Sequence, residues 1–192
     1  MATAENKVYF GLSNVSVAFA DGEETTFDTP TKMPGAVNLS LDAEGEQSVF
    51  YADNIAYYTV NSNSGYSGEL QIARIPNALL AKMLGWVVDQ NGALVEVADG
   101  VPMPFALGYQ VQGDQHPRKA WMYNLTASRP SEEWQTQEDS TEVTVPTLPF
   151  TATPIQIEER NIVKAVIELS ETNKTAYDGF FTSVYTPTFE AA

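Results

Sequence analysis

The sequence predicts a mainly β protein, an antiparallel β-sandwich or barrel with one flanking α-helix and a possible short C-terminal helix. Apolar and polar residues alternate with period two in several segments, whereas only one clear segment has helical spacing. Glycine and proline separate these segments, which gives about eight to ten strands. With 192 residues, 43% of them hydrophobic and 18% charged, residues 1–192 are expected to form a single domain.

The N-terminal third contains two strand patterns. Apolar residues alternate over residues 8–12 and again over 15–19, but with opposite parity, which predicts a bulge or bend at Ser13-Asn14. An acidic turn around Gly22 follows. Residues 37–41 then alternate apolar and polar side chains, so a second strand with one polar face is expected there.

Residues 42–68 are predicted to form a long hairpin-like arm. The segment is hydrophilic and acidic, Gly45 and Gly65 interrupt it, and residues 55–60 form a tyrosine-rich middle. It contains few large aliphatic residues that could form a core of its own. We therefore expect it to reach beyond the body of the domain.

The clearest helix follows Pro76, since proline fits the first turn of a helix, and it ends before Gly85. Its apolar face is formed by Leu79, Leu80, Met83 and Leu84. Asn91-Gly92, between two apolar pairs, predicts a two-residue hairpin turn in which both residues have positive φ.

The C-terminal half contains a well-patterned antiparallel pair, residues 105–111 and 121–125, followed by a polar acidic loop at about 128–142. A strand beginning at Val143 carries prolines, which predict an irregular or edge strand. Alternation over residues 163–169 predicts another strand. Residues 175–184 are predicted to form a short helix that docks Tyr177, Phe180 and Phe181.

Charge and composition exclude several classes of function. Twenty-five acidic against ten basic residues give a net charge of −15, which repels nucleic acid and anionic membranes. The absence of cysteine excludes disulfides, thiolate metal sites and a cysteine nucleophile. Neither a leader segment nor an apolar run of about 18 residues is found, so we expect a soluble chain made in a cytoplasm.

No catalytic motif emerges from the sequence. His116 is the single histidine and lies in a polar loop, and no phosphate-binding glycine loop or metal-binding motif is found. A hydrolase that uses two of the many carboxylates stays open as an alternative, as does calcium binding by the acidic residues 42–46. The sequence favours a non-enzymatic protein without cofactor or metal.

The order of segments resembles the major tail protein family of long-tailed bacteriophages of Gram-positive hosts, over nearly the whole chain. The likeness is distributed rather than motif-based. It is carried by Asn6-Lys7-Val8-Tyr9-Phe10-Gly11-Leu12, Pro34-Gly35-Ala36-Val37-Asn38-Leu39-Ser40-Leu41, Glu44-Gly45, Phe50-Tyr51-Ala52-Asp53-Asn54, Asn63-Ser64-Gly65-Tyr66-Ser67-Gly68-Glu69-Leu70, Phe105-Ala106-Leu107-Gly108-Tyr109, Pro130-Ser131-Glu132-Glu133 and Pro146-Thr147-Leu148.

This resemblance implies a tail-tube subunit of the virion, made in the host bacterial cytoplasm. It implies homo-hexameric rings that stack into a hollow tube, through which DNA passes without specific binding. Other tail proteins are implied as partners, namely the tape measure, the tail terminator and the baseplate or tip proteins, whereas no membrane and no cofactor is implied. We also expect an acidic lumen, because a wall lined by acidic residues offers the DNA phosphates no Lys or Arg to bind.

Long arms suit the open contacts between stacked rings, so the arm is the first candidate for self-assembly. Among the few bases, Arg118, Lys119 and Arg129 are either partners for acids of a neighbouring copy or solvated loop charges, and the sequence does not separate the two. The candidate residues are Asp42, Glu44, Glu46, Asp53, Asn54, Tyr57, Tyr58, Tyr66, Arg118, Lys119 and Arg129.

Two alternatives share the predicted fold class. A jelly-roll or lectin-like module would bind sugar through exposed aromatic residues, although Tyr109, Trp121 and Tyr123 occupy strand positions more typical of a core or interface. A tube protein of a contractile or secretion machine would use the same ring-and-stack assembly.

Overall fold

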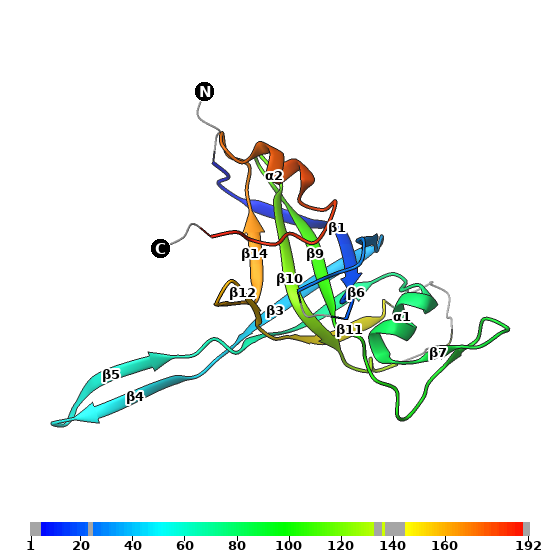
Figure 1. Cartoon of the computed structure of the whole chain (residues 1–192), viewed down its shortest axis with the longest axis horizontal. Helices are drawn as coiled ribbons and strands as arrows, with labels where there is room; N and C mark the ends of the chain where they lie inside the picture. The colour runs from blue at the N-terminus through cyan, green and yellow to red at the C-terminus, as the bar shows by residue number, and fades with distance from the viewer. Residues whose placement is uncertain (1–4, 23–24, 133–135, 137–144, 190–192) are drawn as a thin grey trace.

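The computed structural model describes residues 5–22, 25–132, 136 and 145–189. It confirms a mainly β fold with a large antiparallel sheet and two helices (Figure 1). In chain order the elements are β1 (Tyr9–Phe19), β2 (Thr31–Lys32), β3 (Ala36–Glu44), β4 (Gln47–Ala52), β5 (Ile55–Asn61), β6 (Gly65–Ile72), α1 (Asn77–Leu84), β7 (Val87–Val88), β8 (Leu94–Val95), β9 (Phe105–Gly113), β10 (Arg118–Ala127), β11 (Thr147–Ala152), β12 (Ile155–Ile157), β13 (Arg160–Ile162), β14 (Lys164–Ile167) and α2 (Lys174–Gly179).

The main sheet has eight strands in the order β2-β1-β9-β10-β11-β6-β3, with β14 paired to β10 as well. Strand β10 pairs with three strands. One of its edges pairs with β9, and the other edge pairs with β14 in its first half and with β11 near its end. Asn124 has a φ of 48° and lies where this second neighbour changes. Strands β1 and β3 also contact each other, so the sheet curls around an interior.

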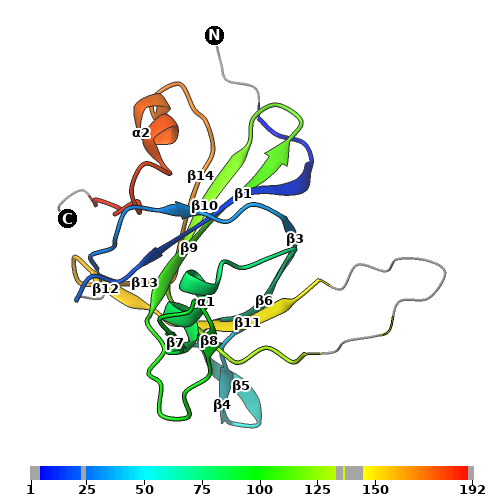
Figure 2. The same cartoon turned by 90° about the vertical axis from the view of Figure 1, so that its right-hand side faces the viewer.

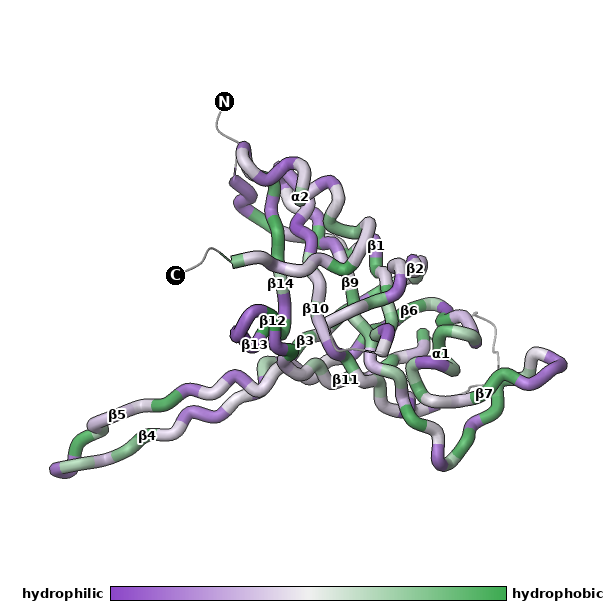
Figure 3. The backbone as a smooth tube through the Cα atoms, in the orientation of Figure 1, coloured by the Kyte–Doolittle hydropathy of each residue, from purple (hydrophilic) through white to green (hydrophobic). Residues whose placement is uncertain are grey.

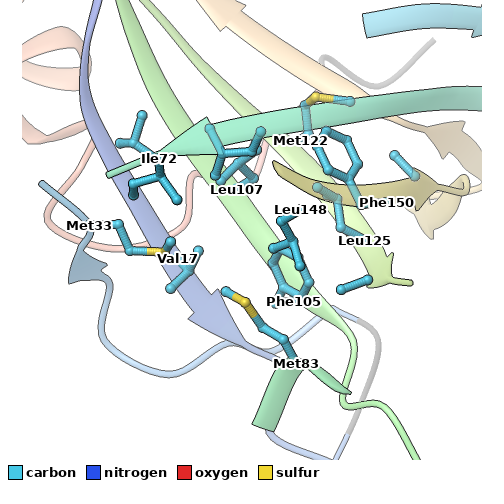
Figure 4. Close-up of a cluster of buried hydrophobic side chains, with 14 of the residues drawn as sticks. Val17, Met33, Ile72, Met83, Phe105, Leu107, Met122, Leu125, Leu148 and Phe150 are labelled. Atoms are coloured by element: carbon cyan, nitrogen blue, oxygen red, sulfur yellow. The ribbon is translucent and has the colours of Figure 1, made fainter. Parts of the chain in front are cut away.

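The interior of the curl holds the larger hydrophobic cluster, which we call the inner cluster (Figure 4). Successive side chains of a strand point to opposite faces, and alternate residues of β11 and of the first half of β9 enter this cluster. Helix α1 adds Met83, which is fully buried, and Leu84. The residues labelled in the close-up are Val17, Met33, Ile72, Met83, Phe105, Leu107, Met122, Leu125, Leu148 and Phe150.

The opposite face of β9 and β10 is also buried, against the C-terminal segment and α2. This outer cluster includes Trp121 and Tyr123, which alternate with the inward-pointing Met122. The Trp121 indole nitrogen donates a hydrogen bond to the Phe180 carbonyl oxygen at 2.8 Å. Figures 1 and 2 show α2 and α1 well apart. The two helices therefore cover different parts of the sheet.

Most of the predicted elements are confirmed. Strand β1 changes register between Ser13 and Ser16, as its parity predicted, and the helix after Pro76 ends at Gly85 in the left-handed conformation. The antiparallel pair β9–β10 is present, and both Tyr177 and Phe180 are buried. The C-terminal helix is shorter than predicted, because α2 ends at Gly179.

Three predictions were wrong in detail. The described residues contain fourteen strands rather than about eight to ten, since β4–β5, β7–β8 and β12–β13 form separate pairs that add to the eight of the main sheet. The turn at Asn91-Gly92 has a positive φ only at Gly92. Its hydrogen bond from the Gly92 N–H to the Asp89 carbonyl, 3.0 Å, makes a longer loop than the predicted two-residue turn.

The third concerns the proline-containing strand, β11, which lies between β10 and β6 rather than at an edge. The Ser128 N–H donates to the Pro149 carbonyl at 2.9 Å, just beyond the last residues that β10 and β11 pair. Because the N and O atoms of one strand residue face the same edge, the missing N–H of Pro149 falls at the end of that ladder. The predicted start at Val143 and most of the acidic loop 128–142 lie outside the described residues.

The packing of the Trp121 ring over Gly108 gives a direct test of the fold. A Cβ atom at Gly108 would lie 2.8 Å from the Trp121 ring, so Gly108→Ala forces the indole to shift in a filled core. We expect it to lower the free energy of unfolding by about 1–3 kcal/mol, measured by urea denaturation. Gly179→Ala is the matched control, because nothing lies within 4 Å of its new Cβ. Equal stability of the two variants would contradict this packing.

Candidate self-assembly surface

The hairpin β4–β5 leaves the body of the domain. Strands β3 and β6 pair as far as Glu44 and Gly65, and beyond them the chain continues outward and returns (Figure 1). We call residues 45–64 the hairpin. A Cβ on Gly65 would lie 1.9 Å from the Ala152 carbonyl oxygen, so only glycine fits where the hairpin joins the sheet. The structure therefore has a hairpin inside the predicted arm 42–68, and the ends of that segment, 42–44 and 65–68, belong to the main sheet.

The tip of the hairpin is a two-residue turn at Asp53-Asn54. Ala52 pairs with Ile55, and the two turn residues have φ values of 51° and 63°. Positive φ at both central residues matches the right-handed twist of a tight hairpin, and Asp and Asn tolerate it well. The candidates Asp53 and Asn54 therefore shape the tip and present it to solvent.

One face of the hairpin is apolar and uncovered. The register pairs Phe50 with Tyr58, Ser48 with Val60 and Ala52 with Ile55, and paired residues share a face. The four large side chains on this face are Phe50, Ile55, Tyr58 and Val60, which are 63%, 61%, 64% and 50% exposed. We call these four residues the apolar face.

The opposite face is more polar, with Gln47, Thr59 and Asn61 beside Val49 and Tyr51. Tyr57 lies at the register shift of β5 and is 69% exposed. Figure 3 shows hydrophobic and hydrophilic residues mixed along the two strands. A hairpin of two strands has no interior, so neither face is buried by the other.

The hairpin and the strands that lead into it carry acids and no base. No base occurs between Lys32 and Arg74, whereas Asp42, Glu44, Glu46, Asp53 and Glu69 lie in this interval. The candidates Asp42, Glu44 and Glu46 lie near its root, where the Ser67 hydroxyl donates to the Glu44 carboxylate at 2.6 Å. Among the described residues no three acidic or histidine side chains are grouped closely enough to bind a metal ion.

The candidate Tyr66 belongs to the body rather than to the hairpin. It lies on β6, is partly buried against the inner cluster, and its ring centre is 4.6 Å from the Lys164 ammonium. Its position makes it a core side chain of the sheet.

Arg118 belongs to a cluster that joins the start of β1 to the residue after β14. Its guanidinium lies 3.3 Å from the Glu168 carboxylate and 5.3 Å from the centre of the Tyr9 ring. The Tyr9 hydroxyl donates to Glu168 at 2.6 Å, and this hydrogen bond raises the pKa of Tyr9. Since all three side chains are substantially exposed, the cluster adds little stability.

Lys119 holds the C-terminal segment to the sheet. Its ammonium donates to the Tyr177 carbonyl at 2.6 Å and lies 3.9 Å from the Tyr177 ring centre and 5.6 Å from that of Phe181. Burial lowers the pKa of this lysine, and burial also raises the pKa of Tyr177. The third base, Arg129, is hydrogen-bonded to Glu96. Each of the three candidate bases thus has a partner in its own chain.

The structure also places the single histidine and the aromatic residues considered for sugar binding. His116 is bonded through its backbone, whose N–H donates to Asn6 at 3.0 Å, while its imidazole makes no hydrogen bond within the described part of the chain. Trp121 and Tyr123 are buried in the outer cluster, so they form no sugar platform. Neither α1 nor α2, the helices of the described residues, is long and apolar enough to cross a membrane.

No protein-family model matches the chain, and no curated protein matches it.

The sequence alone pointed to Tyr57 and Tyr58 but missed Phe50, Ile55 and Val60 as surface residues. The signal that could have found them is the Asp53-Asn54 turn. A hairpin centred on that turn pairs Phe50 with a residue one position before Tyr58, so the sequence alone would have predicted the observed pairing to within one residue. The apolar face would then have been visible in the sequence.

The contrast between two neighbouring bases can be tested. Lys119→Glu places an acid against the Tyr177 carbonyl and removes its donor, so we expect a loss of about 1–3 kcal/mol and faster proteolysis of the C-terminal segment. Arg118→Glu changes the charge equally but at an exposed site, and should leave the stability within about 0.5 kcal/mol. Thermal unfolding and limited proteolysis measure both, and the reverse order would contradict the assigned contacts.

Proposed function

We propose that this chain is a structural subunit that assembles with copies of itself, and that the hairpin is a principal contact of the assembly. The observation that carries the proposal is the apolar face, where Phe50, Ile55, Tyr58 and Val60 are all at least half exposed on a projecting two-stranded ribbon. A contiguous apolar patch of this kind is typical of a protein interface. An isolated hairpin is marginally stable in water, so a partner that covers it also stabilises it.

We further propose the assembly implied by the family resemblance: hexameric rings that stack into the hollow tail tube of a long-tailed bacteriophage virion. The mainly β fold agrees with that expectation. A protruding element that docks on a different surface of the next copy makes a heterologous contact, and such contacts continue indefinitely along an axis when they do not close. Rings that stack need a contact of this open type.

The charge supports the same role. A net charge of −15 gives phosphates few cationic partners, which suits a tube through which DNA moves without specific binding. It also sets a requirement for assembly, because like-charged copies repel one another unless apolar contact outweighs the repulsion.

The experiment compares the two faces of the hairpin. Phe50→Ser with Tyr58→Ser removes two large apolar groups from the apolar face, and Tyr51→Ser with Thr59→Ser is the control on the opposite face. We expect the wild type and the control to form rings or tubes in negative-stain electron microscopy. The apolar-face variant should stay monomeric by light scattering, with unchanged circular dichroism.

A wild type that stays monomeric at every concentration would oppose the proposal. Saccharide binding by such a monomer, found in a glycan screen, would instead favour the sugar-binding alternative. Tubes that form equally well from the apolar-face variant would leave self-assembly standing and remove the hairpin from it. A tube protein of a contractile or secretion machine shares all of these expectations, so the microscopy of the intact particle separates the two.

A further inference from the structure

The outer face of β10 carries a row of hydrogen-bond donors. Lys119, Trp121 and Tyr123 are alternate residues of this strand, so their side chains point to the same face. Their ammonium, indole N–H and hydroxyl groups each donate to a backbone carbonyl oxygen of the C-terminal segment, which crosses β10 after α2 (Figure 1). In the same order, the accepting residues are Tyr177, Phe180 and Tyr185. We call residues 174–189 the strap.

The strap is held by side chains alone. In the described part of the chain, no backbone hydrogen bond joins the strap to a strand of any sheet. Besides the three donors of β10, the buried side chains of Tyr177, Phe180 and Val184 attach it to the outer cluster. The strap therefore belongs to no strand ladder, and its release leaves every strand pair of the main sheet intact.

The chain just before the strap forms a closed turn. The Asn173 side chain accepts from the Ser170 N–H at 2.8 Å and donates to the Glu168 carbonyl at 2.7 Å. The Asn173 carbonyl accepts the first hydrogen bond of α2, from the Tyr177 N–H at 2.8 Å. None of these three bonds involves the outer face of β10, so the turn keeps its shape when the strap lifts and serves as the hinge.

The far end of the strap lies on a strained turn. Glu158 and Glu159 connect β12 to β13, and their φ values are 46° and 63°. A tight two-residue turn requires positive φ at both positions, which glycine and asparagine adopt more readily than glutamate. Backbone strain of this kind persists where the surrounding contacts maintain it, and it often marks a position with a further role.

The side chains of this turn contact the strap at Phe189. The Glu158 carboxylate accepts from the Phe189 N–H at 3.3 Å, and the Arg160 guanidinium lies 4.4 Å from the centre of the Phe189 ring. Glu159 makes no hydrogen bond or ion pair with the described residues. Because Glu158 and Arg160 are exposed, these contacts are weak enough to break and re-form.

We propose that the strap opens from the outer face of β10 as one unit, and that the β12–β13 turn is the latch that holds its far end. Opening uncovers Trp121 and Tyr123, which are 0% and 1% exposed under the strap. Since this exposes an apolar face to water, the open form is the minor state. The device needs only contacts within one copy, so it stands or falls independently of the proposed self-assembly.

The two glutamates of the turn give a matched pair of variants. Glu158→Gly and Glu159→Gly both relieve the backbone strain, so we expect Glu159→Gly to raise the midpoint of thermal unfolding by about 2–4 °C and Glu158→Gly not to lower it. Only Glu158→Gly removes the acceptor of the Phe189 N–H.

The readout is chymotrypsin cleavage of the full chain after Phe180, which is 1% exposed and is cut only when the strap is open. Cleavage should be about fivefold faster in Glu158→Gly than in the wild type, since one hydrogen bond of the closed form is lost. It should be unchanged in Glu159→Gly. Equal cleavage rates in the two variants would overturn the latch.

A second pair of variants tests the strap from its own side. Phe189→Ala removes the ring that lies against Arg160 and should also speed cleavage after Phe180, whereas Thr188→Ala, at an exposed neighbour, should not. Amide exchange of β9 and β11 should match the wild type in all four variants. Faster cleavage after Tyr185 alone, or lost protection of β9 and β11, would contradict the opening of the strap as one unit.

Discussion

The burial of both faces of the β9–β10 pair is the constraint on which the rest of the structure depends. Leu107 and Met122 point into the curl of the sheet, whereas Trp121 points out and closes over Gly108. A strand pair with apolar side chains on both faces is stable only when other elements pack against each face. Helix α1 packs into the inner cluster and the C-terminal segment with α2 covers the outer one, so in the described part of the chain no comparable cover lies on the hairpin.

The proposed function rests on that distribution. The body satisfies its polar groups: in the described residues no buried side-chain nitrogen or oxygen lacks a hydrogen-bond partner. The hairpin instead leaves its apolar face in water, with Phe50 and Tyr58 each more than 60% exposed. Exposing this apolar face to water is unfavourable, and a second surface that covers the hairpin would remove the face from water. Because the three candidate bases, Arg118, Lys119 and Arg129, have partners in their own chain, we expect apolar contact rather than ion pairing by these bases to drive the proposed association.

The sequence predicted the parts of the fold that local rules determine. Period-two alternation located β9 and β10, and the Pro76 and Gly85 signals located α1. It failed where tertiary context decides: Pro149 lies in an interior strand because its missing N–H meets the end of a ladder. Lys119 could not be recognised as an internal anchor, since its partner Tyr177 is distant in sequence. A pocket between the β6–α1 connection, residues 130–132 and β11 was missed for the same reason, because its lining residues are far apart in the sequence.

Amide hydrogen exchange over a concentration series tests the central claim most directly, because it reports on the hairpin in the unmodified chain. In dilute solution the amides of β4 and β5 should exchange rapidly, since a two-stranded ribbon opens easily, while those of β10 stay protected. As light scattering shows the mass rising, protection of β4 and β5 should rise with it. Assembly without any added protection of these two strands would contradict the account.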